Sequence, residues 1–207
     1  MSSSDEQLTC LLNQGLEVLG QSAPTEALLC YLNLLSKWNR AYNLTAVRAK
    51  EDMVTRHLLD SFAILPWVKG QYLLDVGTGA GLPGIPLAIA RPELQVVLLD
   101  SNGKKIRFLQ EVKRVLSLTN VDIVKARVED YRAESSFDTV ISRAFSDIEQ
   151  MMAWTKHVIA PDGIWLAMKG PQVDKELLKI TQPFQVKTYH VPGILGMRCC
   201  VIVENKE

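Results

Sequence analysis

Tyr72-Leu-Leu-Asp-Val-Gly-Thr-Gly-Ala-Gly-Leu-Pro-Gly84 is the stretch of this 207-residue chain that decides its fold. Its first five residues are hydrophobic or aromatic apart from Asp75, as in a strand that is covered on both faces. Glycines then follow at alternate positions, where they permit positive φ angles and let a ligand approach the backbone. Pro83 suits the first turn of a helix, whose free N–H groups would face that ligand. The stretch therefore predicts a strand, a ligand-binding turn and a helix.

The glycines alone do not identify the ligand. Gly79, Gly81 and Gly84 satisfy the G-x-G-x-x-G spacing of dinucleotide-binding proteins. Asp75 favours another cofactor, because a carboxylate two residues before Gly77 would repel a pyrophosphate and attract an amino group. S-adenosylmethionine carries both an α-amino group and a cationic sulfonium. We therefore expect Asp75, Gly77, Gly79 and Gly81 to bind S-adenosylmethionine, with a nicotinamide-dependent oxidoreductase and a ligand-free glycine turn as the alternatives.

A second acidic residue follows where the same interpretation requires one. Residues 95–100 have the pattern of the next strand, which places Asp100 at its carboxyl end, where parallel sheets bind ligands. An acid about 20 residues beyond the glycines commonly binds the ribose hydroxyls of an adenosine-containing cofactor. The alternative is that Asp100 caps the helix expected at residues 103–116.

Composition indicates one compact enzyme with an appendage: 47% of the residues are hydrophobic and 22% are charged. No apolar run approaches the roughly 20 residues of a membrane span, and the amino terminus lacks a secretory pattern, so we expect a cytoplasmic protein without a membrane partner. The 23 basic and 23 acidic residues balance, so a nucleic-acid partner would have to be held by local patches. Four cysteines without C-x-x-C spacing predict neither a metal site nor a disulfide framework.

Helical periodicity precedes the first strand, at about residues 6–19, 25–40 and 53–65. Strands and helices then alternate, which predicts an α/β fold with a parallel sheet covered by helices on both faces. The expected strands are 72–76, 95–99, 121–124, 137–142 and 164–168, and the expected helices start at 83 and 104 and span 147–158 and 173–180. Two further strands, at 184–191 and 199–204, should form an antiparallel hairpin at the sheet edge. We divide the chain into a helical extension, 1–70, and a main domain, 71–207.

A basic and aromatic segment lies in the helical extension. Lys37, Arg40 and Arg48 alternate with Trp38 and Tyr42, a combination that can hold phosphates and stack bases. A solvated helix end with Trp38 in the core explains the same residues almost equally well.

Five segments together are longer than a generic motif: Trp38-Asn-Arg-Ala-Tyr-Asn-Leu-Thr45, Arg56-His-Leu-Leu-Asp-Ser61, Asp75-Val-Gly-Thr-Gly-Ala-Gly-Leu-Pro-Gly-Ile-Pro86, Leu99-Asp-Ser101 and Ile141-Ser-Arg-Ala-Phe145. In these segments the chain resembles the bacterial small-subunit rRNA guanine-N7 methyltransferases, also called the glucose-inhibited division protein B (GidB) family. The resemblance spans nearly the whole chain and is specific.

The resemblance implies a Rossmann-like class I S-adenosylmethionine-dependent methyltransferase fold with a mostly parallel seven-stranded sheet. It also implies cofactor contacts at Gly77, Leu82, the Val128–Glu129 pair and Arg143. An apolar Val128 could lie against adenine, although a core valine beside a surface acid is the alternative interpretation. The implied substrate is 16S rRNA, within the small ribosomal subunit or its assembly intermediate.

The chemistry of the fourth strand end agrees with this expectation. Amino-group methyltransferases usually carry Asp/Asn-Pro-Pro-aromatic there, and this chain has Ser142-Arg-Ala-Phe145. Guanine N7 needs neither that turn nor a cysteine nucleophile, so positioning and electrostatics can carry the transfer. We expect Arg143 to be catalytic, near guanine and cofactor, with Phe145 or Tyr42 stacking on the base. Weaker candidates for RNA contacts are Asn39, Arg40, Arg48, His57, Lys169 and Arg198.

The residues define the oligomeric state and the presence of catalysis less well. No self-complementary seam is evident, so we expect a monomer. A methyltransferase-like RNA-binding module without catalysis remains an alternative, which the intact glycines and both acids disfavour.

Overall fold

The computed structural model describes residues 3–143, 145 and 147–206, and its centre is a seven-stranded sheet. The strands lie in the order β3-β2-β1-β4-β5-β7-β6. Every pairing is parallel except those of β7, which runs antiparallel to both β5 and β6. The bounds are β1 Tyr72–Val76, β2 Gln95–Asp100, β3 Val121–Lys125, β4 Phe137–Ser142, β5 Ile159–Lys169, β6 Phe184–Tyr189 and β7 Arg198–Glu204. The mostly parallel sheet and its closing hairpin are confirmed.

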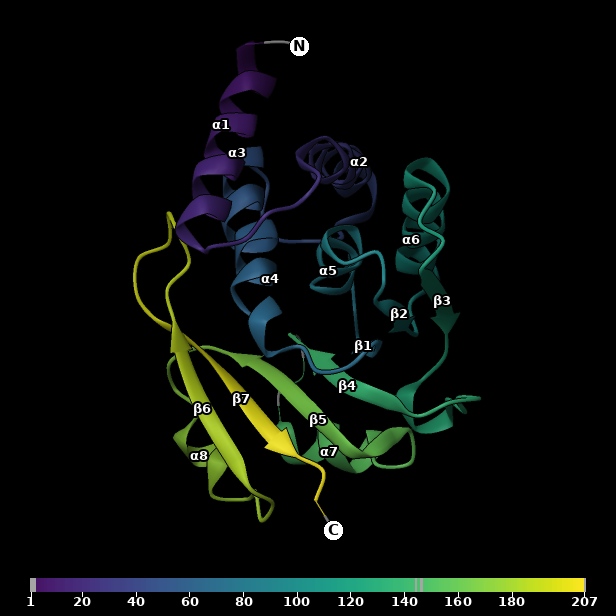
Figure 1. Cartoon of the computed structure of the whole chain (residues 1–207). Coiled ribbons are helices and arrows are strands. Elements are labelled where there is room, and N and C mark those ends of the chain that lie inside the picture. The colour runs from purple at the N-terminus through teal and green to yellow at the C-terminus, as the bar shows by residue number, and fades with distance from the viewer. Residues whose placement is uncertain (1–2, 144, 146, 207) are drawn as a thin grey trace.

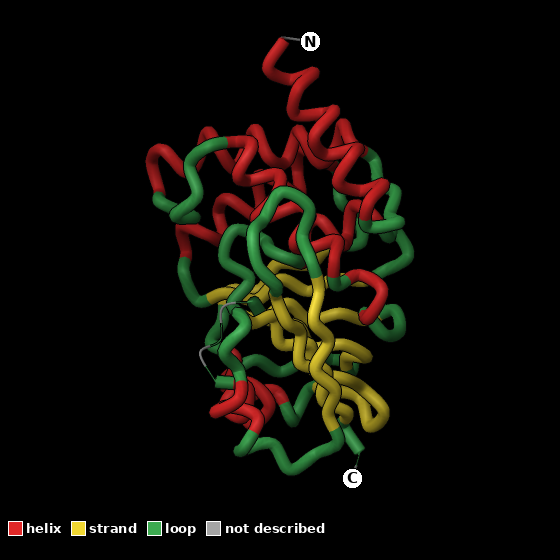
Figure 2. Tube along the Cα trace, turned by 90° about the vertical axis from the view of Figure 1, so that its left-hand side faces the viewer, coloured by secondary structure: helices red, strands yellow, loops and turns green. Residues whose placement is uncertain are grey.

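Helices cover both faces of this sheet (Figure 1). One face carries α1 (Ser3–Val18), α2 (Thr25–Tyr42), α5 (Gly84–Ala90) and α6 (Gly103–Leu116), and the opposite face carries α7 (Ile148–Thr155) and α8 (Asp174–Leu177). Figure 2 shows the same layers from the side, with strands between two groups of helices. Two clusters of buried apolar side chains correspond to the two faces. Among the described residues, no helix is both long and apolar enough to cross a bilayer.

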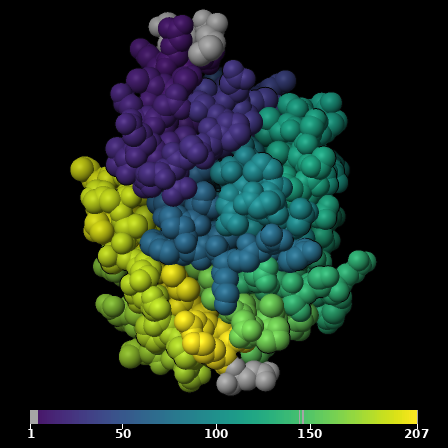
Figure 3. All heavy atoms as spheres, viewed as in Figure 1, coloured from purple at the N-terminus to yellow at the C-terminus, as the bar shows by residue number. Residues whose placement is uncertain are grey.

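The helical extension shares its core with the sheet. Leu32 and Leu35 of α2 belong to the same buried cluster as Ile85 and Leu109 of α5 and α6. Tyr31 on α2 is fully buried, and its hydroxyl donates to the carbonyl oxygen of Ala80 at 2.8 Å. In the space-filling view the first two helices continue without a break into the rest of the molecule (Figure 3). The division at residues 70 and 71 stays a prediction.

The third helical segment differs from the single helix expected at 53–65. It consists of α3 (Lys50–Met53), a π-helical turn η1 (Val54–Leu59), α4 (Asp60–Ala63) and the 3₁₀ turn η2 (Leu65–Trp67). A π turn places one extra residue in each turn, so it rotates the following side chains relative to an α-helix. As a result His57 and Asp60 are both buried, facing the ends of the strands.

Some elements differ in length from the prediction. β5 begins at Ile159, five residues before the expected start, and α8 spans only four residues of the expected helix at 173–180. Pro83 caps α5, which begins at Gly84. The turn near Pro192 and Gly193 joins β6 to β7 as expected, with the Ile194 N–H bonded to the Val191 carbonyl.

Candidate functional site

A cavity of about 400 Å³ opens at the carboxyl ends of β1, β2 and β3. Gly77 follows β1, Asp100 ends β2, and Val128 and Glu129 lie in the 3₁₀ turn η3 (Val128–Asp130) that follows β3. This is the edge at which open α/β sheets bind ligands, and the volume suits a small-molecule site. The fold therefore brings four of the expected cofactor-binding residues to one cavity.

Gly77 forms the part of the cavity nearest to β1. Its φ angle is +65°, and a Cβ added to it would meet no atom within 4 Å. Its N–H donates to the Leu99 carbonyl oxygen at 2.9 Å, which fixes the loop on β2. The open space beside this Cα belongs to the cavity, so any side chain here would occupy ligand volume.

Asp100 is buried and holds the glycine loop from the neighbouring strand. Its Oδ2 accepts from the Gly79 N–H at 3.0 Å and from Lys105 Nζ at 3.2 Å, and its Oδ1 accepts from the Asn102 N–H at 2.8 Å. A carboxylate offers about four acceptor positions, so one remains for a ligand hydroxyl. Asn102 caps α6 by accepting from the Lys104 N–H, so Asp100 is not the cap.

Asp75 lies beneath the loop, outside the described lining of the cavity. It is fully buried, and its Oδ2 accepts from the Thr78 hydroxyl at 2.7 Å and from the Gly84 N–H at 2.8 Å. This corrects two expectations: Asp75 shapes the loop instead of facing the ligand, and the first N–H of α5 is already bonded. Local sequence could not show this, because it depends on how the loop folds back over the strand.

Gly81 and Leu82 also serve packing. A Cβ on Gly81 would come within 2.5 Å of Ile85 Cγ1, and Leu82 is 3% exposed in the core beneath the cavity. Gly79 differs, since its N–H bonds to Asp100 and its own Cβ position lies 3.9 Å from Lys105 Nζ. Of the expected contacts in the glycine loop, only Gly77 lines the cavity.

Arg143 directly follows β4 and points toward the helical extension. Its Nη1 donates to the Arg56 carbonyl oxygen at 3.2 Å and lies 3.8 Å from Asp60 Oδ2. The carboxylate of Asp60 also pairs with Arg198 Nε at 3.3 Å and accepts from the Tyr189 hydroxyl at 3.2 Å. Arg143 is therefore beside, and not among, the residues that line the cavity. Its side chain is 25% exposed, which leaves it accessible to a substrate.

His57 belongs to the same buried polar cluster. Its Nε2 lies 2.9 Å from the Thr45 hydroxyl, and its Nδ1 lies 3.4 Å from Arg143 Nη1. Burial, followed by the charge of Arg143, lowers the pKa of His57 to about 4. The imidazole is therefore neutral near pH 7. These contacts support a structural role for His57 in place of the expected RNA contact.

Among the other residues expected to contact RNA, some side chains are hydrogen-bonded within the protein and one is exposed to solvent. Asn39 is buried and bonded to Val47 and Thr45, which is incompatible with the expected RNA contact. Arg48 is exposed but donates to the Asn39 carbonyl and to Asn43, where it caps the end of α2. Arg40 is exposed in a shallow hollow shared with two lysines, Lys37 and Lys50.

Several cavity residues were not expected from the sequence. Lys105 on α6 and Gln150 and Trp154 on α7 line it together with Phe145, which had been assigned to the base. The ring of Phe145 meets the ring of Trp154 edge-on, with centroids 5.7 Å apart. Gln150 and Trp154 are four residues apart on one helix, a spacing that could have predicted that both lie on the same helix face.

Asp75 gives a testable pH dependence. Burial raises its pKa from 3.8 to about 6, against the lowering effect of its two hydrogen bonds. The folded protein therefore binds this proton more tightly than the unfolded chain, and the free energy of unfolding falls as the pH rises through this window. Asp75→Asn lacks this titration. The difference in free energy of unfolding, variant minus wild type, should therefore rise by about 2 kcal/mol from about pH 4 to pH 7, measured by urea unfolding. If the free energies of unfolding of the variant and the wild type differ by the same amount at every pH, the raised pKa of Asp75 is contradicted.

Comparisons with known proteins agree with this geometry. Residues 24–198 match the family described as GidB, rRNA small subunit methyltransferase G. The chain is 58% identical over 199 residues to the ribosomal RNA small subunit methyltransferase G of Legionella pneumophila, covering 96% of each chain. It is 49% identical over 201 residues to the protein of the same name from Pseudomonas aeruginosa, covering 94% of each.

A solved structure shares the fold at much lower sequence identity. Magnesium protoporphyrin IX methyltransferase from Synechocystis, with bound S-adenosylmethionine, superposes with a TM-score of 0.59 at 15% identity, over 85% of this chain and 97% of that one. The class I methyltransferase fold expected from the sequence is thereby confirmed. With a family match across most of its length and close relatives of nearly equal length, the chain belongs to the GidB family of small-subunit rRNA methyltransferases.

Proposed function

We propose that this chain transfers the methyl group of S-adenosylmethionine to N7 of a specific guanine in bacterial 16S rRNA. The supporting observation is the cavity at the carboxyl ends of β1, β2 and β3, in a chain of the small-subunit rRNA methyltransferase family. The transfer is a direct displacement without a covalent enzyme intermediate.

The cavity fits S-adenosylmethionine in three respects. Gly77 provides a surface that a Cβ would fill, and Asp100 keeps acceptor capacity for a ribose hydroxyl. Val128 and Glu129 supply an apolar contact and a polar edge suited to adenine. When bound, S-adenosylmethionine supplies an electrophilic methyl group on a cationic sulfur.

The protein has little covalent chemistry to perform in this reaction. The N7 lone pair of guanine attacks without prior loss of a proton, so no general base is required. His57 is neutral but buried against Thr45, and Cys199 donates to the Gly170 carbonyl. Neither needs to act as base or nucleophile, and the residues of the site hold the two reactants in line. Arg143 is our candidate for the group that contacts the guanine or the cofactor.

The substrate is large and structured, while the chain carries balanced charge. A small ribosomal subunit or its assembly intermediate would supply part of the recognition surface, and the exposed Arg40 with Lys37 and Lys50 is a candidate contact for phosphate. We place the enzyme in the bacterial cytoplasm, where this substrate is found, and expect it to act as a monomer.

A methyl-transfer assay tests the proposal. Small ribosomal subunits and naked 16S rRNA that lack the modification are incubated with the protein and methyl-labelled donor, and labelled nucleosides are separated. Label in 7-methylguanosine is the expected result. Calorimetry with S-adenosylhomocysteine and NAD accompanies the assay. Saturation by NAD alone would favour an oxidoreductase, and S-adenosylhomocysteine binding without label in either RNA would favour a non-catalytic module.

Arg143→Ala should lower the rate of this transfer by about a hundredfold, the usual cost of removing one oriented donor from a reacting site. The variant should retain its thermal unfolding transition, because Asp60 keeps its pair with Arg198. Arg114→Ala, which removes an exposed cation of α6, is the control. An unchanged rate would remove Arg143 from the site.

Gly77→Ala should weaken S-adenosylhomocysteine binding at least tenfold, as a rough expectation for a methyl group placed in ligand volume. Gly20→Ala is a matched control: Gly20 has a φ of +64°, and its added Cβ would also meet nothing within 4 Å. Both variants carry the same backbone strain, of about 1–2 kcal/mol. Calorimetry should therefore show weaker S-adenosylhomocysteine binding by Gly77→Ala than by Gly20→Ala, although both variants are similarly destabilised. Equal affinities would contradict the position of Gly77 in the site.

A further inference from the structure

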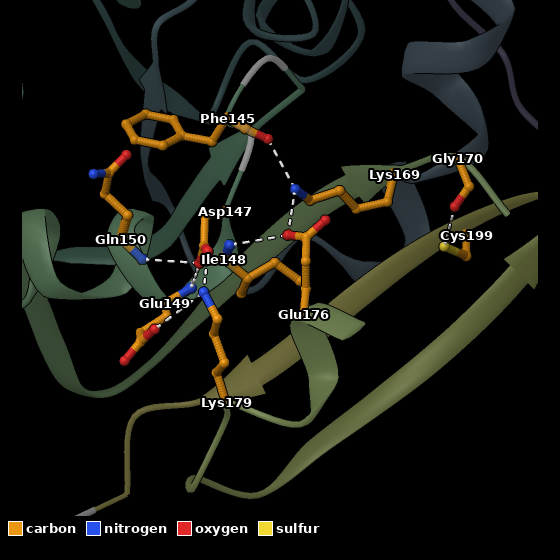
Figure 4. Close-up of polar contacts among 10 residues, drawn as sticks. All are labelled: Phe145, Asp147, Ile148, Glu149, Gln150, Lys169, Gly170, Glu176, Lys179 and Cys199. Atoms are coloured by element: carbon orange, nitrogen blue, oxygen red, sulfur yellow. Dashed lines mark hydrogen bonds and ion pairs between the residues drawn. The ribbon is translucent and has the colours of Figure 1, made fainter. Parts of the chain in front are cut away.

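Lys169 ends β5, and its ammonium group is directed into the protein. Its side chain is 10% exposed. Its Nζ donates to the Phe145 carbonyl oxygen at 2.8 Å and to Glu176 Oε2 at 2.7 Å (Figure 4). Two of its three N–H donors are thus engaged within the protein, and little of the side chain is open to an RNA phosphate. The RNA contact expected for Lys169 therefore does not agree with its surroundings.

Glu176 extends this contact to the start of α7. The same Oε2 that receives Lys169 also accepts from the Ile148 N–H at 3.1 Å. Ile148 is the first residue of α7, where backbone N–H groups have no partner inside the helix. One carboxylate oxygen thus joins β5, α7 and α8, as the dashed lines in Figure 4 show.

A second contact holds the same helix end from the outside. Asp147 caps α7 by accepting from the Glu149 N–H at 2.9 Å, and its other oxygen accepts from Lys179 Nζ at 2.6 Å. The side chain of Lys179 is 50% exposed, so solvent and salt weaken this pair. Lys169 and Glu176, at 10% and 22% exposure, form the better protected of the two contacts.

The elements held in this way form one wall of the cavity. Phe145, Gln150 and Trp154 line it, and the Phe145 and Trp154 rings support each other edge-on. Phe145 belongs to no strand or helix, so no ladder of backbone hydrogen bonds holds it. The hydrogen bond from Lys169 to its carbonyl oxygen joins this loop residue to the rigid sheet.

We propose that Lys169 and Glu176 are positioning residues that hold the Phe145–Trp154 wall of the cavity against the bound methyl donor. This inference rests on the proposed function, because it assigns the cavity to S-adenosylmethionine. It predicts that loss of the pair weakens donor binding and leaves rRNA binding intact.

Lys169→Met tests this, since it keeps the aliphatic stem and removes the ammonium. Calorimetry should show an S-adenosylhomocysteine Kd raised about tenfold, and kinetics should show a raised KM for the donor. The KM for the small subunit, and its dependence on salt, should stay unchanged. Lys169→Arg should restore most of the affinity, because a guanidinium can donate to both oxygens.

Lys175→Met is the matched control. Lys175 lies on α8, one residue before Glu176, and is exposed. The variant therefore loses the same charge as Lys169→Met, from the helix that carries Glu176, without touching the cavity wall. It should bind S-adenosylhomocysteine like wild type. Glu176→Gln, which keeps an acceptor for Ile148 but no charge for Lys169, should give an intermediate Kd and carries the test if Lys169→Met does not fold.

The opposite pattern would overturn the inference. If Lys169→Met keeps the wild-type Kd for S-adenosylhomocysteine, raises the KM for the small subunit and flattens its salt dependence, then Lys169 contacts phosphate. A wild-type protein that binds no S-adenosylhomocysteine would instead refute the proposed function. The two failures are therefore distinguishable in one set of measurements.

Discussion

The candidate site depends on a carboxylate that does not reach it. Asp75 Oδ2 accepts from both Thr78 and Gly84, and so it fixes the two ends of the loop that forms one side of the cavity. Its other oxygen is buried without a hydrogen-bond partner among the described residues, and burial raises its pKa. The protein therefore tolerates an unfavourable ionisation in order to fix the conformation of this loop, a common arrangement near functional sites.

A second buried carboxylate joins parts of the chain that are distant in sequence. Asp60, in the helical extension, meets Arg143 at the end of β4 and Arg198 at the start of β7. If Arg143 and Arg198 were both removed, the buried carboxylate of Asp60 would have no compensating charge, which costs several kcal/mol, about 3–5. Buried charges consequently join the extension to the strand ends beside the cavity.

The sequence predicted what local patterns encode. Hydrophobic runs located the strands, and the carboxyl ends of those strands brought Gly77, Asp100 and the Val128–Glu129 pair to one cavity. It did not predict the π turn at Val54–Leu59, because helical periodicity is judged over a whole segment and does not show one turn with an extra residue. It also missed the partners of Arg143 and Lys169. The Arg143 contact with the Arg56 carbonyl joins residues 87 positions apart, and only the packed fold brings them together.

The position of β7 has a consequence for synthesis of the protein. β7 lies between β5 and β6, so until residues 198–204 have been synthesised β5 lacks a partner along one edge and β6 lacks its partner strand. An exposed β5 edge, with Trp165 and Leu166 beside it, could pair with other nascent chains. A chain that ends before residue 198 would therefore leave the β5 edge exposed, which is an aggregation hazard.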